Sequence, residues 1–175
     1  MKLRNIHDEI TVNVTTADMW TVLARYGDVS TFHGGVKESF HVSGSKDTAE
    51  IGGERICNIV DMGLKIQLKE RITNYVEGES YQYEVYEWKN FPVRKMLFSF
   101  AITQDKQGNA ILKLDIDYKA KPAFLTPLMA GKMKKLARDI LLGYKHYAET
   151  GEINRSIKSL RKKYRDSLNQ DPLLS

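Results

Sequence analysis

Glu70 is the side chain whose type and position could most plainly do chemistry. Strand periodicity places it on the same face as four apolar side chains, namely Leu64, Ile66, Leu68 and Ile72. A carboxylate on an apolar face needs a partner or a proton, because burying it alone costs several kcal/mol. We therefore consider two roles for Glu70, a cavity anchor that meets a ligand directly or through water, and a structural ion pair, most simply with Arg55.

Arg55 is the cation that could complete this site. It alternates with Cys57 and Ile59, and neither face of its predicted strand is cleanly polar. An inward Arg55 would neutralise Glu70 or hold a ligand carboxylate. The alternative is a surface arginine near the start of a strand, since arginine is rarely fully buried.

The other candidate binding residues are apolar or aromatic and share the inward faces of strands and of a long helix. They are Tyr83, Met96, Phe98, Phe100, Tyr118, Met133, Ile140 and Tyr144. Such a set predicts an adaptable pocket, because methionine accommodates varied ligand shapes, although a packed core without a vacancy has the same pattern. If a reaction is catalysed, Glu70 and Tyr83 are the candidates for general base and acid in an aldol-type cyclisation or dehydration.

Other kinds of chemistry find little support. Cys57 lies in mid-strand without a neighbouring histidine, as expected of a buried, inert thiol. The four histidines, at positions 7, 33, 41 and 146, lack metal-ligand spacing, and no glycine-rich segment matches a phosphate-binding loop. We expect no metal and no cofactor, and we expect His33 to be exposed at a pocket rim.

The elements that position these residues can be read from periodicity. Ile10, Val12 and Val14 predict a first strand, followed by a helix capped at 16–18 and ended at Gly27, and by a short helical piece over 29–33. Between Val36 and Lys121 the period is close to two, with turns at 43–45, 62–63, 77–79, 90–92 and 105–109. This predicts six further strands, joined as an antiparallel meander because the connections are short.

One long helix is predicted from Ala123 to Thr150, with Gly151 ending it. Its apolar face carries Met129, Met133, Leu136, Ala137, Ile140, Tyr144 and Tyr147, and its other face carries Lys132, Lys135, Arg138, Asp139 and Lys145. The fold class is thus α+β, a seven-stranded curled antiparallel sheet with two short helices after the first strand. The long C-terminal helix lies across the concave face and encloses a cavity.

Length and charge divide the chain. The 175 residues form one domain with a net charge of +5, but residues 132–175 carry eleven basic and five acidic side chains, which leaves 1–131 at −1. One cysteine, no signal peptide and no membrane-spanning run predict a cytoplasmic protein.

We divide the chain into a ligand-binding domain, 1–151, and a basic amphipathic extension, 152–175. The extension has an apolar stripe, made of Ile153, Ile157, Leu160, Tyr164 and Leu168. This stripe suits contact of 152–168 with a membrane surface or a partner protein, or packing on its own domain or on a second subunit as a homodimer. Nucleic acid is not expected, because Tyr164 is the extension's one aromatic residue.

Several short motifs in order resemble one superfamily. They are Ala17-Asp18-Met19-Trp20, Ile51-Gly52-Gly53-Glu54-Arg55, Lys69-Glu70-Arg71-Ile72, Phe91-Pro92-Val93 and the helix end from Leu141 to Gly151. The chain between residues 4 and 151 is similar to the START-like, or helix-grip, superfamily of polyketide cyclases/dehydrases and lipid transport proteins (SRPBCC type). The resemblance implies binding or transport of a lipid, isoprenoid or aromatic polyketide in an internal cavity. A polyketide cyclase/dehydrase using that cavity and an interaction protein acting through its surface and basic C-terminal helix are the alternatives.

Plant abscisic-acid receptors share this fold, and a lysine similar in position to Lys37 meets the ligand carboxylate there. The resemblance adds Lys37 to the ligand-binding candidates, although alternation with Val36, Phe40 and Val42 favours a solvated side chain. The gate sequence of those receptors is replaced by Met62-Gly63-Leu64-Lys65, so the hormone-receptor mechanism does not transfer.

Overall fold

The computed structural model describes residues 2–42, 48–61, 63–153 and 155–168. Its strands are β1 (Arg4–Val12), β2 (Val36–His41), β3 (Glu54–Asp61), β4 (Leu64–Val76), β5 (Ser80–Lys89), β6 (Val93–Gln104) and β7 (Ala110–Ala120). Its helices are α1 (Thr16–Leu23), the 3-10 helix η1 (Tyr26–Thr31), α2 (Leu125–Leu128), α3 (Ala130–Thr150) and α4 (Ile157–Leu168). The predicted turn residues 43–45 and Met62 lie outside the described residues.

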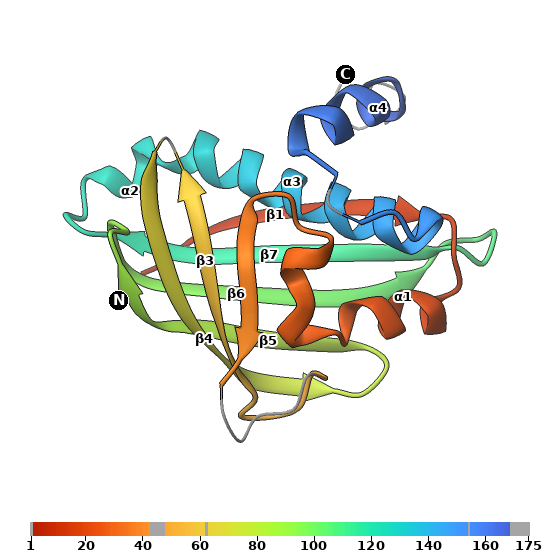
Figure 1. The fold of residues 1–175 in the computed structure, drawn as a ribbon, viewed down its shortest axis with the longest axis horizontal. Coiled ribbons are helices and arrows are strands. Elements are labelled where there is room, and N and C mark those ends of the chain that lie inside the picture. The colour runs from red at the N-terminus through yellow and green to blue at the C-terminus, as the bar shows by residue number, and fades with distance from the viewer. Residues whose placement is uncertain (1, 43–47, 62, 154, 169–175) are drawn as a thin grey trace.

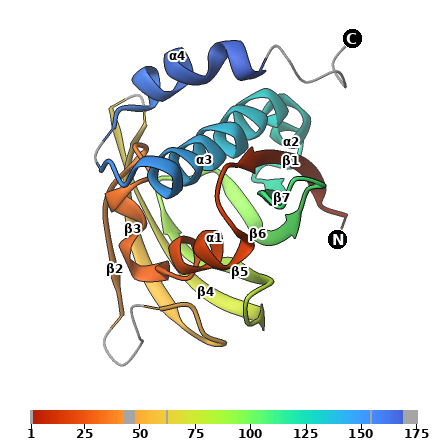
Figure 2. The same cartoon turned by 90° about the vertical axis from the view of Figure 1, so that its right-hand side faces the viewer.

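The seven strands form one antiparallel sheet in the order β1-β7-β6-β5-β4-β3-β2. The meander from β2 to β7 follows the chain, and β1 pairs with β7, which brings Ile6 opposite Ile116. The sheet curls around α3, with α1 and η1 beside it at one end (Figures 1 and 2). The predicted α+β helix-grip fold is therefore confirmed, and the described part of the chain contains no helix long and apolar enough to cross a membrane.

The helix boundaries correct the sequence-based expectations. Thr15, rather than 16–18, caps α1, because its side chain accepts a hydrogen bond from the Asp18 amide. The long helix begins at Ala130 and not at Ala123, since the segment containing Pro122 and Pro127 forms a turn and the separate helix α2. Its end at Thr150 is as predicted, with Gly151 in the left-handed conformation.

The core lies between the concave face of the sheet and α3. Alternate residues of β6 and β7 are buried, as their period predicts, and so are Met133, Ala137, Ile140 and Tyr144 on α3. The expected polar face of α3 is only partly solvated, because Asp139 and Lys145 are buried. Lys145 Nζ donates to the Thr11 carbonyl at 2.7 Å, so this face of the helix rests on the end of β1.

Gly143 allows α3 to pack closely on the segment after η1. A Cβ at this position would lie 2.6 Å from the Phe32 carbonyl oxygen, which is backbone and cannot move aside cheaply. We expect Gly143→Ala to lower the free energy of unfolding by about 1–3 kcal/mol through overpacking, despite the better helix propensity of alanine. Urea denaturation measures this change.

Gly131 provides the matched control on the same helix. A Cβ there meets no atom within 4 Å, so Gly131→Ala is expected to stabilise the protein by up to about 1 kcal/mol. Equal effects of the two substitutions would contradict the close approach of α3 to Phe32.

Candidate binding site

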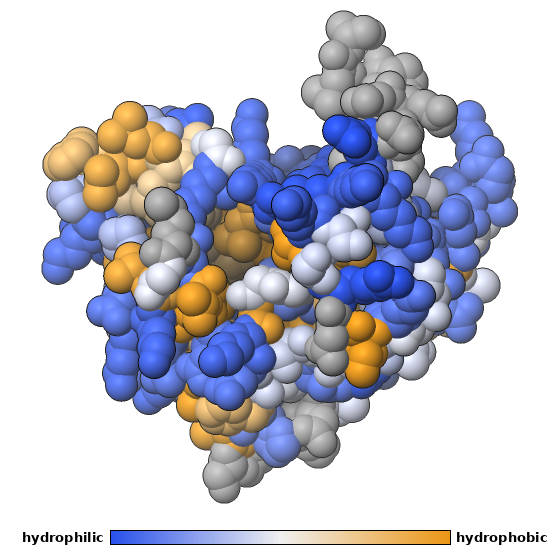
Figure 3. Space-filling view, turned by 45° about the horizontal axis from the view of Figure 1, so that its top comes forward, coloured by the Kyte–Doolittle hydropathy of each residue, from blue (hydrophilic) through white to orange (hydrophobic). Residues whose placement is uncertain are grey.

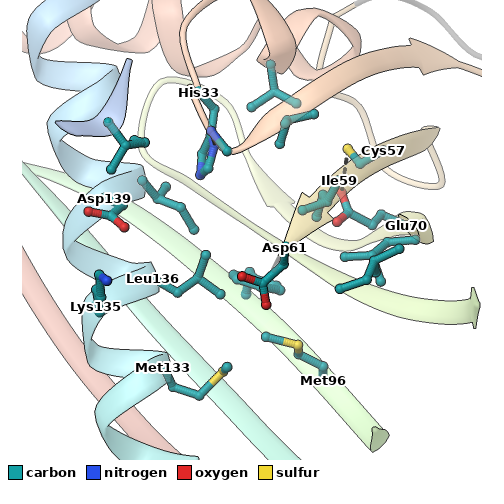
Figure 4. A pocket seen from close by; sticks show the side chains of 18 of the residues that line it. His33, Cys57, Ile59, Asp61, Glu70, Met96, Met133, Lys135, Leu136 and Asp139 are labelled. Atoms are coloured by element: carbon teal, nitrogen blue, oxygen red, sulfur yellow. Dashed lines mark hydrogen bonds between the residues drawn. The ribbon is translucent and has the colours of Figure 1, made fainter. Parts of the chain in front are cut away.

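A cavity of about 540 Å³ lies between the curled sheet and α3. Nine of the eleven predicted ligand-binding residues line it, namely Arg55, Glu70, Tyr83, Met96, Phe98, Phe100, Met133, Ile140 and Tyr144. Figure 4 shows Met96 and Met133 at one end of the cavity, and Glu70 and Cys57 at another. The sheet supplies them because alternate side chains of β3 to β6 point to its concave face.

Arg55 and Glu70 form an ion pair inside the protein. Both residues are only 3% exposed, and the Arg55 Nε atom lies 2.5 Å from Glu70 Oε2. They face each other because Arg55 and Glu70 are directly paired in the register of β3 and β4. Burial is the largest single influence and opposes the charged guanidinium, but Glu70 together with Cys57, Tyr83 and Tyr26 raises the pKa of Arg55 well above its usual value.

Two aromatic rings and a carbonyl also hold Arg55. Its guanidinium carbon lies 4.2 Å from the ring centre of Tyr26 and 4.7 Å from that of Tyr83, and Nη1 donates to the Tyr26 carbonyl at 2.8 Å. Cys57 also contacts the pair, because its thiol lies 3.8 Å from Glu70 Oε2 and its side chain hydrogen-bonds to Arg55. The pair is thus anchored by the protein, and both of its members line the cavity.

The aromatic wall around the pair is closely packed. Tyr83 stacks on Phe98 with ring centres 4.9 Å apart, and Phe100 meets Tyr144 edge to face at 5.5 Å. Burial, with the charge of Glu70 adding to it, raises the pKa of Tyr83 well above its usual value. Burial likewise raises the pKa of Tyr144, so both hydroxyls are proton donors rather than bases.

Two predicted ligand-binding residues do not reach the cavity. Lys37 is exposed on the edge strand β2, beside a register shift between Val36 and Glu38, and it is not part of the cavity lining. Tyr118 is buried, but its hydroxyl donates to the Thr126 carbonyl at 2.7 Å, which ties β7 to α2. Tyr118 therefore secures the end of the sheet instead of lining the cavity.

His33 and Cys57 line the cavity as buried, uncharged groups. His33 is 6% exposed, which contradicts its predicted exposure at the rim, and its Nδ1 accepts a hydrogen bond from the Gly35 amide at 3.0 Å. Burial lowers the pKa of His33 to about 4, so the imidazole is neutral at pH 7. Burial also raises the pKa of Cys57 well above its usual value, in agreement with the predicted inert thiol.

Charged residues at the cavity edge were not among the sequence-predicted site residues. Lys132 pairs with Asp61, and Arg161 forms a bidentate pair with Asp139 in which Nε lies 2.7 Å from Oδ1. Helical spacing carried a usable signal, because Lys132 and Asp139 are seven residues apart and so share one face of α3, next to the apolar face that carries Ile140. Arg161 could not be found this way, since it reaches the cavity from α4.

The helix α4 lies against α3 (Figure 2). Leu160 and Tyr164 are buried together with Leu142 of α3, and the Tyr164 hydroxyl is 3.0 Å from His146 Nδ1. Leu160 and Tyr164 of the amphipathic stripe thus pack on their own domain, whereas Ile153 is 54% exposed. Ile157 also lines the cavity, so α4 forms part of its wall; residues 169–175 of the predicted extension lie outside the described residues.

The described residues include no cluster of three or more histidine, cysteine, aspartate or glutamate side chains that could hold a metal ion. The groups that the cavity offers are a buried ion pair, further ion pairs at its edge, hydroxyls, a neutral imidazole and a large apolar surface. These groups can orient a mostly apolar molecule that carries one polar end.

Solved structures of low sequence identity share this fold. The crystal structure of Ara h 8.0201 superposes with a TM-score of 0.68 at 18% identity, covering 83% of this chain and 97% of that one. The crystal structure of TTHA0849 from Thermus thermophilus superposes with a TM-score of 0.69 at 11% identity, covering 83% of this chain and 97% of that one. The structure of a START superfamily protein from Mycobacterium smegmatis superposes with a TM-score of 0.61 at 11% identity, covering 78% of this chain and 94% of that one.

No protein of curated function matches the sequence. The sequence pattern of one family, described as polyketide cyclase / dehydrase and lipid transport, matches residues 4–149. This match covers every strand, and it ends one residue before the end of α3. The chain belongs to the polyketide cyclase/dehydrase and lipid transport family.

Proposed function

We propose that the protein reversibly binds a hydrophobic small molecule with one polar end, of the lipid, isoprenoid or aromatic polyketide class. The observation that carries the proposal is a mostly apolar cavity of about 540 Å³ with the Arg55–Glu70 pair in its wall. This volume is within the range of about 300–1,000 Å³ that is typical of small-molecule sites. The polar end would meet the charged groups of Arg55 and Glu70, because both residues line the cavity.

The ionisation of the cavity groups favours binding over catalysis. An efficient general base has a pKa near the working pH, whereas the pKa of His33 is lowered to about 4 and the pKa values of Tyr83 and Cys57 are raised. The alternative, a cyclase/dehydrase, is supported by the convergence of Glu70, Tyr83 and Tyr144 on one cavity. Turnover of a polyketide by the native protein that Glu70→Gln abolishes would establish the enzyme instead of the binding protein.

Binding in the cavity can be tested by filling it. Native mass spectrometry of the purified protein, with extraction of any retained molecule, identifies the ligand class. The dye anilinonaphthalene sulfonate, which joins an aromatic ring system to one anionic sulfonate, serves as a probe in solution. Leu136 lines the cavity from α3, and Leu136→Trp should occupy part of it. We expect dye affinity and ligand retention to fall at least about tenfold. The indole ring would displace ligand from the cavity, and the apolar surface that the ligand could then no longer bury corresponds to more than a few methylene groups.

Leu97→Trp is the matched control, because Leu97 lies on β6 between the inward-facing Met96 and Phe98 and points to the other face of the sheet. The control should bind as the native protein does, and circular dichroism should show both variants folded. Unchanged binding by folded Leu136→Trp would place the ligand elsewhere.

A further inference from the structure

Three segments that are distant in sequence meet at one end of the molecule. They are the connection of β3 to β4 (60–61 and 63–65), residues 89–95 and residues 119–135. We call these residues together the mouth ring. The Lys121 amide donates to the Pro92 carbonyl at 3.0 Å, and Asn90 Nδ2 donates to the Lys65 carbonyl at 2.9 Å. An ion pair between Lys132 and Asp61 closes the ring. These contacts join each segment to both of the others.

The mouth ring borders the cavity. Its residues in the cavity lining are Val60, Asp61, Phe91, Gly131, Lys132, Met133 and Lys135. In the space-filling view, a hollow lies beside the apolar cluster at the upper left of Figure 3, where α2 is found. A surface that contacts the ring would therefore lie next to the cavity.

The mouth ring is strongly basic. It holds one acidic residue, Asp61, and nine basic ones, Lys65, Lys89, Arg94, Lys95, Lys119, Lys121, Lys132, Lys134 and Lys135. This net charge of +8 exceeds the +5 of the whole chain, so the rest of the chain sums to −3. Within the described residues, Lys132 is the one basic member for which an ion pair is seen, and its partner is Asp61.

Like charges are also placed side by side in the ring. Lys95 lies opposite Lys119 in the register of β6 and β7, an arrangement that destabilises an isolated sheet. An anionic partner would relieve this repulsion. The concentration of cations at one end of the molecule thus points to a partner with many negative charges.

Large apolar side chains are exposed among these cations. Val60 is 50% exposed, Leu64 58%, Phe124 68% and Leu128 74%, which are half of the large hydrophobic residues described as exposed in this structure. They come from the end of β3, the start of β4 and the region of α2. Exposed apolar side chains surrounded by lysines are typical of surfaces that lie at the interface of a lipid bilayer.

We infer that the mouth ring docks the protein on an anionic lipid surface, with Phe124 and Leu128 entering the acyl boundary and the lysines meeting the phosphates. Nucleic acid would use the charge, but it would leave the aliphatic residues Val60, Leu64 and Leu128 without a role. The stripe of α4 is not the docking face, because Leu160 and Tyr164 are buried against α3. The inference is independent of what the cavity holds.

The test is sedimentation of the full chain with vesicles of phosphatidylcholine alone or mixed with phosphatidylglycerol. We expect binding to the mixed vesicles only, weakened by salt. Phe124→Asp/Leu128→Asp should lower partitioning at least about tenfold, and Lys121→Glu/Lys134→Glu roughly thirtyfold or more. All four side chains are exposed, so the variants should fold.

Two controls locate the effect on the ring. Ile51→Asp changes an equally exposed apolar residue before β3, at the opposite end of that strand from Val60, and should bind as the native protein does. Lys158→Glu/Lys162→Glu reverses exposed charges on α4 and should have little effect. Loss of vesicle binding in the α4 variant but not in the ring variants, or native-protein binding to DNA but not to vesicles, would overturn the inference.

Discussion

Arg55→Met is expected to lower the free energy of unfolding by about 3–5 kcal/mol, because it leaves the Glu70 carboxylate buried without its counter-ion. The guanidinium donates to Glu70 Oε2 at 2.5 Å and to the Tyr26 carbonyl at 2.8 Å, and both contacts are removed. Methionine keeps much of the side-chain volume between the rings of Tyr26 and Tyr83, so the loss reports charge rather than a void. Urea denaturation at pH 7 measures it.

The double variant Arg55→Met/Glu70→Leu separates the cost of an unpaired charge from the value of the pair. Replacing both partners by apolar groups removes the charge that needs a partner, so we expect the double variant to recover most of the lost stability. Tyr26→Phe is the control for ring packing, because the Tyr26 hydroxyl is the one fully buried polar side-chain atom without a partner among the described residues. It should change stability little.

A different stability of the double variant would change the role that we assign to the Arg55–Glu70 pair. If the double variant is as unstable as Arg55→Met alone, the ion pair itself stabilises the fold, and the unpaired carboxylate is not the cause of the loss. The double variant also tests the proposed function, since a ligand whose polar end meets Arg55 and Glu70 should lose affinity while a wholly apolar ligand should not. The dye and native mass spectrometry assays apply to it directly.

Local patterns predicted much of the fold and the apolar wall of the cavity. Alternation in β4 placed Glu70 inward, and alternation in β6 placed Met96, Phe98 and Phe100 inward. Such an assignment needs only the sequence of one strand, because successive side chains of a strand point to opposite faces of the sheet. Arg55 was different, since neither face of β3 is cleanly polar, and an inward and a surface position stayed open as alternatives. The register with β4, which pairs Arg55 with Glu70, supplies the physical reason for the inward position.

Contacts between distant segments could not be read from periodicity. Asp139 was assigned to a solvated face of α3, yet Arg161 of α4 covers it, and only the packing of the two helices shows this. The basic charge was assigned to the C-terminal quarter of the chain. In the folded protein, Lys65, Lys95 and Lys119 lie in the mouth ring together with the lysines of the first turns of α3. His33 was expected at the surface because its neighbouring glycines suggested a loop.

His33→Asn is expected to remove part of the acid sensitivity of the protein. Burial lowers the pKa of His33 from 6.5 to about 4, although Asp139 partly offsets this and Arg55 adds to it. Between these pH values the unfolded chain binds a proton that the folded protein does not, so stability falls as the pH falls. The native protein should lose about 3 kcal/mol through His33 as the pH falls from 6.5 to about 4, and this loss should level off within about one pH unit below that.

Asparagine is the informative replacement because its side-chain oxygen can take the place of His33 Nδ1 and accept the Gly35 amide, while it carries no titratable group in this range. Urea denaturation of both proteins at pH 7 and at about pH 4 gives the comparison, and the difference between the two pH-induced losses isolates His33 from every other titrating group. A loss in His33→Asn as large as in the native protein would show that the imidazole takes up its proton in the folded state. The cavity beside Asp139 would then be wet enough to hold the charge, and an acidic or hydrogen-bonding ligand group would find a cation there.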